Sequence, residues 1–392
     1  MSVTAAEQSV LDRIDEDLLV RVTVELLQAR GQNPPGDEAA TVAALGGFAR
    51  GLGLDVATTV VEPGRENLTA TLAGGNGPGL LLLGHTDVVP VGDGWTTDPF
   101  GGEVKDGRIY GRGASDMKGG LAAALVALAA LRGARLSGPV ELAAVVDEEE
   151  TGKGIRAYVA EAGRSFVGCI TAEPTDLQTI IAARGDSYLR VAVHGRACHA
   201  GNPADGANAI YGAAAVVAEI ERLHGELAAD PHPLLGPATW SVGQINGGTG
   251  GSIVPAECVV VADRRLLPGE SPAVVLDDLR ARVVGLGLDG RDLTVDLDMP
   301  MEMPAFETAA DAELVRVTEA ARIDAGGPDL PLGGWTAACD GGYVARDLGV
   351  PVVVLGPGSV TSQAHRADES VSIAELVTAA RAYTLTALRL LS

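Results

Sequence analysis

The chain has 392 residues, of which 46% are hydrophobic, and a formal net charge of −23. This length allows two domains, and the acidic balance argues against nucleic acid and anionic membranes as partners, because both require clustered cations. No apolar run reaches the roughly 20 residues of a membrane span. Because the acidic segment 1–17 also lacks the apolar core of a signal peptide, we expect a cytoplasmic protein.

Helical and strand patterns alternate in the first half of the chain. The helical patterns cover 16–30, 37–52, 118–131 and 153–162, and short apolar runs cover 54–61, 66–73, 80–84, 140–147 and 168–173. Apolar runs of this length, separated by helices, are typical of buried parallel strands. The alternation therefore predicts an α/β fold.

The pattern changes near residue 184. Residues 187–194 alternate as a half-exposed antiparallel strand does. A helical pattern at 206–228, strand patterns at 238–246 and 257–265, a helical pattern at 271–285 and a strand pattern at 292–298 follow. This order is the ferredoxin-like arrangement. We predict a mixed, mainly parallel sheet with flanking helices in residues 1–183 and 300–392. An inserted α+β domain is predicted at 184–299.

Four apolar runs of the α/β part are each followed by histidine or acidic residues. The first leads to His85 and Asp87, the second to four acids at 147–150, the third to Glu173, and the last, at 352–355, to His365. In an open α/β sheet, ligands bind outside the carboxyl ends of the strands. We therefore expect these side chains to converge on one site, although they are far apart in sequence.

A further acidic residue, Asp116, follows a glycine-rich turn at 111–115. It is either the N-cap of the helix that comes after it or a carboxylate that bridges two cations. Two histidines, one aspartate and two glutamates form a ligand set for two metal ions. A shared aspartate leaves a coordination position open for water, which is typical of a catalytic metal site.

The four acids at 147–150 also have two interpretations. A run of charges is usually a solvated face, but this run ends a buried strand, where functional sites form. One glutamate as metal ligand and its neighbour as general base is the arrangement that a metal hydrolase needs. The second ring nitrogen of His85 needs a partner that fixes the tautomer, and Asp87 is a candidate.

Several of these segments resemble the M20 metallopeptidase family. They are GHTDVVP at 84–90, GRGASDMKGG at 111–120, DEE at 147–149 and EPT at 173–175. The family includes acetylornithine deacetylase, succinyl-diaminopimelate desuccinylase, aminoacylase and glutamate carboxypeptidase. The motifs follow one another over nearly the whole chain, and the resemblance implies a di-zinc exopeptidase-like fold for the α/β part.

The resemblance also implies how two metal ions would be held. His85 and Glu173 would hold one ion, Glu149 and His365 would hold the other, and Asp116 would bridge the two. The implied ions are Zn²⁺, with Co²⁺ as the alternative.

Two further roles are implied near these ligands. Asp87 would orient His85, and Glu148 would be the general base, although the extra Glu150 allows a register shifted by one residue. The family has a cis peptide after the bridging aspartate, so the bond between Asp116 and Met117 is expected to be cis.

In the inserted domain, the segment from Cys198 to Gly201 is similar to the family's lid motif. There the histidine, here His199, reaches into the partner subunit's active site and stabilises the tetrahedral oxyanion, which implies a homodimer joined through the lid. The resemblance places substrate contacts at Arg184, Arg265, Ser252 and Thr336. The arginines match positions that often bind a substrate carboxylate, and Ser252 stands where many relatives have asparagine.

The implied function is a dinuclear metal-dependent amidohydrolase that cleaves the amide bond of N-acyl amino acids, similar to acetylornithine deacetylase or succinyl-diaminopimelate desuccinylase. A dipeptidase or carboxypeptidase of the same family is one alternative, and a metal-dependent binding protein is another. A nucleotide-dependent oxidoreductase would rest on Gly111 and Gly113 alone. The third glycine of that fingerprint is missing, because position 116 is aspartate.

Overall fold

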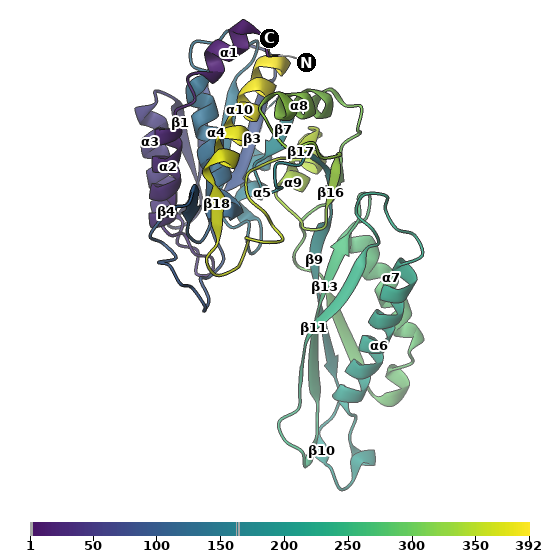
Figure 1. Cartoon of the computed structure of the whole chain (residues 1–392). Coiled ribbons are helices and arrows are strands. Elements are labelled where there is room, and N and C mark those ends of the chain that lie inside the picture. Colours follow the sequence, from purple (N-terminus) through teal and green to yellow (C-terminus); the bar gives the residue numbers. More distant parts are fainter. Residues whose placement is uncertain (1–2, 162, 164) are drawn as a thin grey trace. The chain divides into compact units, whose positions relative to one another are not determined.

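The computed structural model describes residues 3–161, 163 and 165–392 and divides into two compact units (Figure 1). The first unit contains the chain up to Ile181 together with Glu307–Gly334 and Asp340–Ser392. The second unit contains Ala182–Phe306 and Trp335–Cys339. Each unit has its own hydrophobic core.

A mixed nine-stranded sheet forms the centre of the first unit. Its order is β1 (Asp55–Glu62), β2 (Arg65–Leu72), β6 (Val140–Val145), β3 (Gly79–His85), β7 (Phe166–Thr171), β17 (Val352–Val354), β8 (Ile180–Ala183) and β15 (Phe306–Glu307), with β16 (Gly333–Trp335) paired to β8. The central strands β6, β3, β7 and β17 pair in parallel. The pairs β1–β2, β2–β6 and β17–β8 are antiparallel.

Helices flank this sheet in two groups (Figure 1). The first group packs around α4 and α10, with α3 in contact with α2. It consists of α1 (Ala5–Leu11), α2 (Glu16–Gln28), α3 (Ala39–Gly51), α4 (Gly119–Ala130), α8 (Glu313–Asp324) and α10 (Ile373–Leu390). The other consists of α5 (Lys153–Ala160) and α9 (Gly341–Leu348). The expected helix at 153–162 includes Ala162, which lies outside the described residues. A small sheet, ordered β18 (Ser370–Ser372), β5 (Arg108–Tyr110) and β4 (Glu103–Lys105), completes the unit.

The topology explains why one edge of the central sheet collects functional residues. The crossover through α4 leads from β3 to β6, and the crossover through α5 leads back from β6 past β3 to β7. Right-handed crossovers in opposite directions place their helices on opposite faces of a sheet. The reversal leaves a crevice at the carboxyl ends of the strands, which is the usual ligand site of such sheets.

The second unit has a four-stranded antiparallel sheet ordered β11 (Thr239–Gly247), β13 (Glu257–Leu266), β9 (Gly185–His194) and β14 (Thr294–Asp298). Helices α6 (Ala209–Leu227) and α7 (Pro272–Gly285) connect these strands in the expected β-α-β-β-α-β order. A short pair, β10 (Cys198–His199) and β12 (Ile253–Val254), lies in the connecting loops. The fold class predicted from the sequence, a mixed α/β sheet with flanking helices and a separate antiparallel α+β part, is confirmed.

The boundaries of the second unit differ from the predicted 184–299. Residues 300–306 belong to it because Met303 exchanges two backbone hydrogen bonds with Asp186, of 2.7 and 2.9 Å. Residues 335–339 belong to it as well, and the Trp335 carbonyl accepts from the Arg184 N–H at 3.0 Å. These are pairings between distant segments, which local sequence patterns do not encode.

Among the described residues, none of the helices combines the length and the hydropathy needed to cross a bilayer.

The start of α4 packs closely against the end of β7, and this contact yields a stability prediction. A Cβ atom on Gly120 would lie 2.0 Å from the Ala172 carbonyl oxygen, whereas one on Gly47, an exposed position of α3, would meet nothing within 4 Å. We expect Gly120→Ala to destabilise the protein by about 1–3 kcal/mol or more through overpacking. Gly47→Ala should stabilise it by about 0.5–1 kcal/mol, since alanine favours helix.

Urea unfolding followed by far-UV circular dichroism compares these two substitutions directly. A Gly120→Ala protein as stable as the unmodified chain would contradict the close approach of α4 to residue 172.

Candidate metal centre

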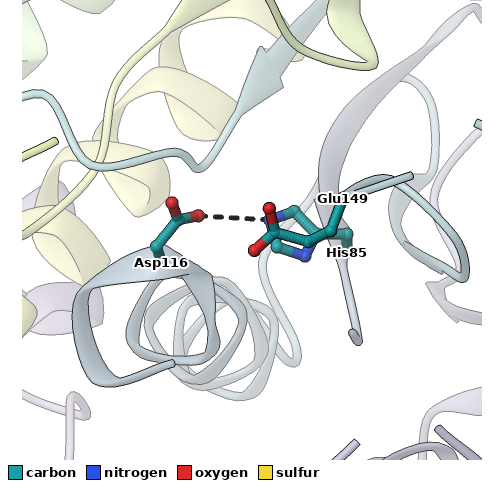
Figure 2. Close-up of side chains that lie close together, drawn as sticks. All are labelled: His85, Asp116 and Glu149. Atoms are coloured by element: carbon teal, nitrogen blue, oxygen red, sulfur yellow. Dashed lines mark hydrogen bonds and ion pairs between the residues drawn. The ribbon is translucent and has the colours of Figure 1, made fainter. Parts of the chain in front are cut away.

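The Asp116 carboxylate lies between two imidazole rings. Its Oδ1 is 3.2 Å from His85 Nε2 (Figure 2), and its Oδ2 is 3.3 Å from His365 Nε2. One ligand atom each of His85, Asp116 and Glu149 lies within 4.8 Å of the others. Because each oxygen faces a different histidine, Asp116 can share one cation with each of them. The residue is not a helix N-cap, since Gly113 caps the irregular turn Ala114–Lys118 and Lys118 precedes α4.

The remaining candidate ligands divide between the two sides of Asp116. Glu173 Oε1 is 3.6 Å from His85 Nε2, and we call His85 and Glu173 the inner cluster. Glu149 Oε2 is 3.2 Å from His365 Nε2, and we call this pair the outer cluster. The His85 side chain is 1% exposed and the His365 side chain is 52% exposed. The structure therefore brings all five predicted ligands together, in two clusters that meet at Asp116.

The His85 ring is oriented by Asp87, but mainly by its backbone. His85 Nδ1 is 2.9 Å from the Asp87 carbonyl oxygen and 3.5 Å from its carboxylate. A Nδ1–H that donates to this carbonyl leaves the Nε2 lone pair directed at the site. Both oxygen groups belong to Asp87, and the nearer acceptor is the main chain, so the role of Asp87 in orienting His85 stays a prediction.

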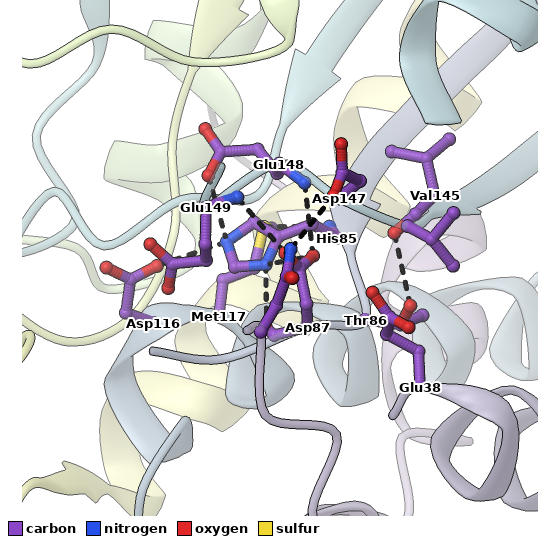
Figure 3. Close-up of polar contacts among 12 residues, drawn as sticks. Glu38, His85, Thr86, Asp87, Asp116, Met117, Val145, Asp147, Glu148 and Glu149 are labelled. Atoms are coloured by element: carbon purple, nitrogen blue, oxygen red, sulfur yellow. Dashed lines mark hydrogen bonds and ion pairs between the residues drawn. The ribbon is translucent and has the colours of Figure 1, made fainter. Parts of the chain in front are cut away.

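The Asp87 carboxylate instead holds the turn that carries Glu148 and Glu149 (Figure 3). It accepts hydrogen bonds from the N–H of Glu148 at 3.2 Å and from the N–H of Glu149 at 3.1 Å. Asn33 Nδ2 donates to the same carboxylate at 3.0 Å. Burial would raise the pKa of Asp87, but the nearby His85 ring and the hydrogen bond from Asn33 outweigh it and hold the pKa below its usual value. An ionised Asp87 thus fixes the backbone of the two glutamates.

The four consecutive acids occupy different environments. Asp147 is buried, has a positive φ of 68°, and accepts hydrogen bonds from Asn33 at 3.1 Å and Arg65 at 2.9 Å. Glu148 Oε2 lies 3.9 Å from His85 Nε2, Glu149 belongs to the outer cluster, and Glu150 is exposed. The strand end therefore directs Glu148 and Glu149 to the candidate site.

More negative charge is buried here than the protein's own hydrogen bonds can balance. Among the described residues, Glu149 Oε1, Glu173 Oε1 and both carboxylate oxygens of Asp340 are buried without a hydrogen-bond partner. Burial raises the pKa of Glu148 and Glu173 well above the usual value, and that of Asp340 to about 8. Buried carboxylate oxygens that lack donors are satisfied by cations. Imidazole and carboxylate ligands suit Zn²⁺ and similar divalent ions, so the donor set fits two such ions.

Two further residues of this site were not among the predicted site residues. Asn33 lies in a proline-rich turn, and only the fold places its amide between Asp87 and Asp147. Asp340 ends the stretch 335–340, which keeps the Thr and Asp expected from the family resemblance although its middle is not diagnostic. Asn33 would have been found only by knowing which distant residues the strand ends face.

The other predicted site residues lie in the second unit. His199 is exposed on β10, and its Nδ1 accepts a hydrogen bond from the Gly201 N–H at 3.0 Å. Ser252 and Thr336 are exposed. The structure does not assign a ligand to any of the three.

The two predicted substrate-binding arginines already have partners in this unit. Arg184 Nε donates to the Leu235 carbonyl oxygen at 3.1 Å. Arg265 Nη2 lies 3.0 Å from Asp263 and 3.5 Å from Asp186, its register neighbour on β9. Arg265 is therefore largely neutralised by its own sheet, which weakens its case as the anchor for a substrate carboxylate.

The chain is similar to known proteins in sequence and in fold. A model of the peptidase family M20/M25/M40 matches residues 81–389. An acetylornithine deacetylase of Klebsiella pneumoniae is 35% identical over 346 residues, which cover 83% of this chain and 84% of that protein.

Two solved structures share the fold. An M20 family metallo-carboxypeptidase from Sulfolobus solfataricus has a TM-score of 0.76 at 20% identity, with 94% of this chain and 98% of that chain covered. A dinuclear metal-binding peptidase of the M20 family from Bacillus subtilis has a TM-score of 0.73 at 14% identity, covering 96% and 98%.

Because His365 is ionisable, we expect metal binding at the outer cluster to depend on pH. Hydrogen bonds to Asp116 and Glu149 raise the pKa of His365 to about 10 in the metal-free protein, so the ring is protonated at about pH 7. Because the pKa is higher in the fold than in the unfolded chain, protonation of His365 stabilises the metal-free fold. The contribution is complete at pH values below about 6.5, the pKa of the ring in the unfolded chain, and is lost as the pH rises through about 10. A cation needs the neutral ring, so we expect its affinity to rise with pH up to about 10.

Proton release on adding Zn²⁺ to the metal-free protein near pH 7, measured in weak buffer with an indicator dye, tests this dependence. His365→Gln should release fewer protons per chain than the unmodified protein. Equal release from both proteins would show that His365 is not a protonated ligand of the outer cluster.

Proposed function

The chain belongs to the peptidase family M20/M25/M40 and is a metallohydrolase, and we propose that it is a dinuclear amidohydrolase that cleaves N-acyl amino acids. The observation that carries the proposal is the placement of Asp116, whose two oxygens each face one histidine, with a glutamate on either side. The N-acyl amino acid class is favoured by the 35% identity to an acetylornithine deacetylase.

In this proposal the two clusters hold two divalent cations. His85 and Glu173 would hold one, Glu149 and His365 would hold the other, and Asp116 would serve both. Zn²⁺ is the proposed ion, and Co²⁺ is the alternative. When bound, such ions polarise the scissile carbonyl group and lower the pKa of water.

Glu148 is the proposed general base. It is buried, its Oε2 lies 3.9 Å from His85 Nε2, and Asp87 accepts a hydrogen bond from its backbone N–H, so its carboxylate is close to the inner cluster. Glu148 accepts a proton from the water that adds to the carbonyl carbon. It then delivers this proton to the amide nitrogen as the C–N bond breaks, giving a carboxylic acid and an amine, and the acid then ionises to the carboxylate by losing its proton to the amine or to water.

We also propose a homodimer joined through the second unit, in which His199 serves the partner's site. The Gly201 N–H donates to His199 Nδ1, which leaves the proton on Nε2, on an exposed ring. An outward N–H of this kind is the donor that an oxyanion requires. Substrate contacts by Arg184, Arg265, Ser252 and Thr336, and a cytoplasmic location, remain predictions.

The experiment that tests the function is amine release from a panel of N-acetyl, N-succinyl and N-formyl amino acids and dipeptides. We expect chelator-sensitive turnover, restored by Zn²⁺ or Co²⁺, on one N-acyl group. Turnover of dipeptides alone would instead identify a peptidase with the same chemistry. No turnover on any member, with metal bound, would contradict the proposal and favour a binding protein.

Glu148→Gln in the same assay separates catalysis from metal binding. The amide keeps the size of the side chain but cannot accept the proton, so we expect turnover to be lost while the metal content stays that of the unmodified protein. An active Glu148→Gln enzyme would exclude Glu148 as the base. Glu150→Gln is the matched control. Glu150 lies two positions after Glu148 and is exposed, so this variant should remain active.

His199→Ala tests the role in the partner's site. Loss of an oxyanion donor should lower kcat by about 10²–10³ with little change in KM. If the role crosses between subunits, mixing this variant with Glu148→Gln should restore part of the activity, because mixed dimers contain one complete site. An unchanged kcat for His199→Ala would refute the role.

A further inference from the structure

A buried glutamate outside the two clusters holds the turn that carries Asp116. Glu369 is 1% exposed, and its carboxylate accepts four hydrogen bonds. Oε1 accepts from the N–H groups of Ser115 at 2.9 Å and Asp116 at 3.0 Å. Oε2 accepts from the Gly113 N–H at 3.1 Å and from Arg112 Nη1 at 2.6 Å. We call Glu369 and Arg112 the clamp.

The clamp acts on the backbone from which Asp116 projects. Three of the four groups that donate to the Glu369 carboxylate are backbone N–H groups of this turn. They belong to Gly113, Ser115 and Asp116 itself. Backbone N–H groups bonded to a carboxylate are held more strongly than those bonded to neutral acceptors. The Glu369 carbonyl oxygen adds a bond from the Gly111 N–H at 2.8 Å. The position of the Asp116 carboxylate therefore depends on Glu369.

The same clamp is joined to the loop of His365. Glu369 follows His365 by four residues, and Arg112 Nη1 also donates to the Arg366 carbonyl oxygen at 3.2 Å. His365 itself is half exposed and is not part of a strand or helix. The clamp is thus a direct connection between Asp116 and the segment that carries the outer histidine.

The inner cluster has a different support. His85 is the last residue of β3, and Glu173 follows β7 by two residues, in the middle of the buried central sheet. Loss of the clamp would leave these strands unchanged. The two clusters share Asp116 but differ in what else fixes them.

From this difference we propose that Glu369 is a positioning residue that sets the affinity of the outer cluster for its metal ion. It does so by fixing Asp116 relative to His365. The inference rests on the proposed function, since it needs two cations in the site. Arg112 contributes by balancing the buried charge of Glu369 and by bonding the His365 loop.

Glu369→Gln is the direct test, because glutamine keeps the size of the side chain but turns an NH₂ group toward two of the four donors. Titration of the metal-free protein with Zn²⁺ should show two binding events in the unmodified chain. The event that is lost in His365→Ala identifies the outer cluster. We expect Glu369→Gln to weaken that event by at least about 10-fold, as loss of an outer-shell partner does. The inner event also uses Asp116, but it should weaken less, because His85 and Glu173 stay fixed by the central strands.

Glu270→Gln is the matched control in the second unit. Glu270 accepts from the Leu267 N–H at 2.7 Å and from Arg264 Nη2 at 2.6 Å, so it makes the same type of contact without touching a candidate ligand. It should leave both binding events unchanged. If Glu369→Gln does not fold, Arg112→Lys, which keeps the charge but not the forked contacts, should show the same selective loss.

Three results would overturn the inference: unchanged binding in Glu369→Gln, equal weakening of both events, or the same weakening in Glu270→Gln. A failure of the proposed function is distinguishable. If the two-cation site is absent, the unmodified protein binds fewer than two Zn²⁺ ions, and if only catalysis is absent, the amine-release assay fails while both binding events remain.

Discussion

Several carboxylates are buried within a few ångströms of Asp116, and the surrounding protein does not supply enough donors for them. Burial would raise the pKa of Asp116, but hydrogen bonds from His365 and His85 outweigh it and hold this pKa low. Burial raises the pKa of Glu148, Glu149 and Glu173. Like charges at this spacing cannot all ionise together without a compensating positive charge. The carboxylates of the metal-free site therefore repel one another, and bound cations would compensate this repulsion. This need for cations explains the choice of ligands and their geometry.

The scaffold holds these charges together with a second set of polar residues. Asp87 fixes the turn of the two glutamates, Asn33 links Asp87 to Asp147, and Arg65 pairs with Asp147 and with the buried Glu38. The clamp of Glu369 and Arg112 fixes the turn that carries Asp116. A metal site that is fixed in this way loses little entropy when it binds, which favours both affinity and a defined position for the reacting carbonyl group.

Much of this could be predicted from the sequence, for a physical reason. Buried parallel strands need unbroken apolar runs, so His85, Glu149 and Glu173 are conspicuous as the polar residues that end them. The motifs of the family then assign Glu149 as a ligand and Glu148 as the base, and this assignment stays a prediction. The remaining features depend on contacts between distant segments: Asn33 with Asp147, Glu369 with the Asp116 turn, and residues 335–339 with the second unit. The close contact of His85 with the Asp87 carbonyl oxygen is likewise a matter of backbone geometry, which residue type does not reveal.

The central claim is that Asp116 is shared by two cations, one in each cluster. Anomalous X-ray scattering at the zinc edge, from crystals grown with Zn²⁺, measures this directly. The account predicts two peaks on either side of the Asp116 carboxylate, one bonded by His85 and Glu173 and the other by Glu149 and His365. A single peak, or peaks away from Asp116, would contradict it.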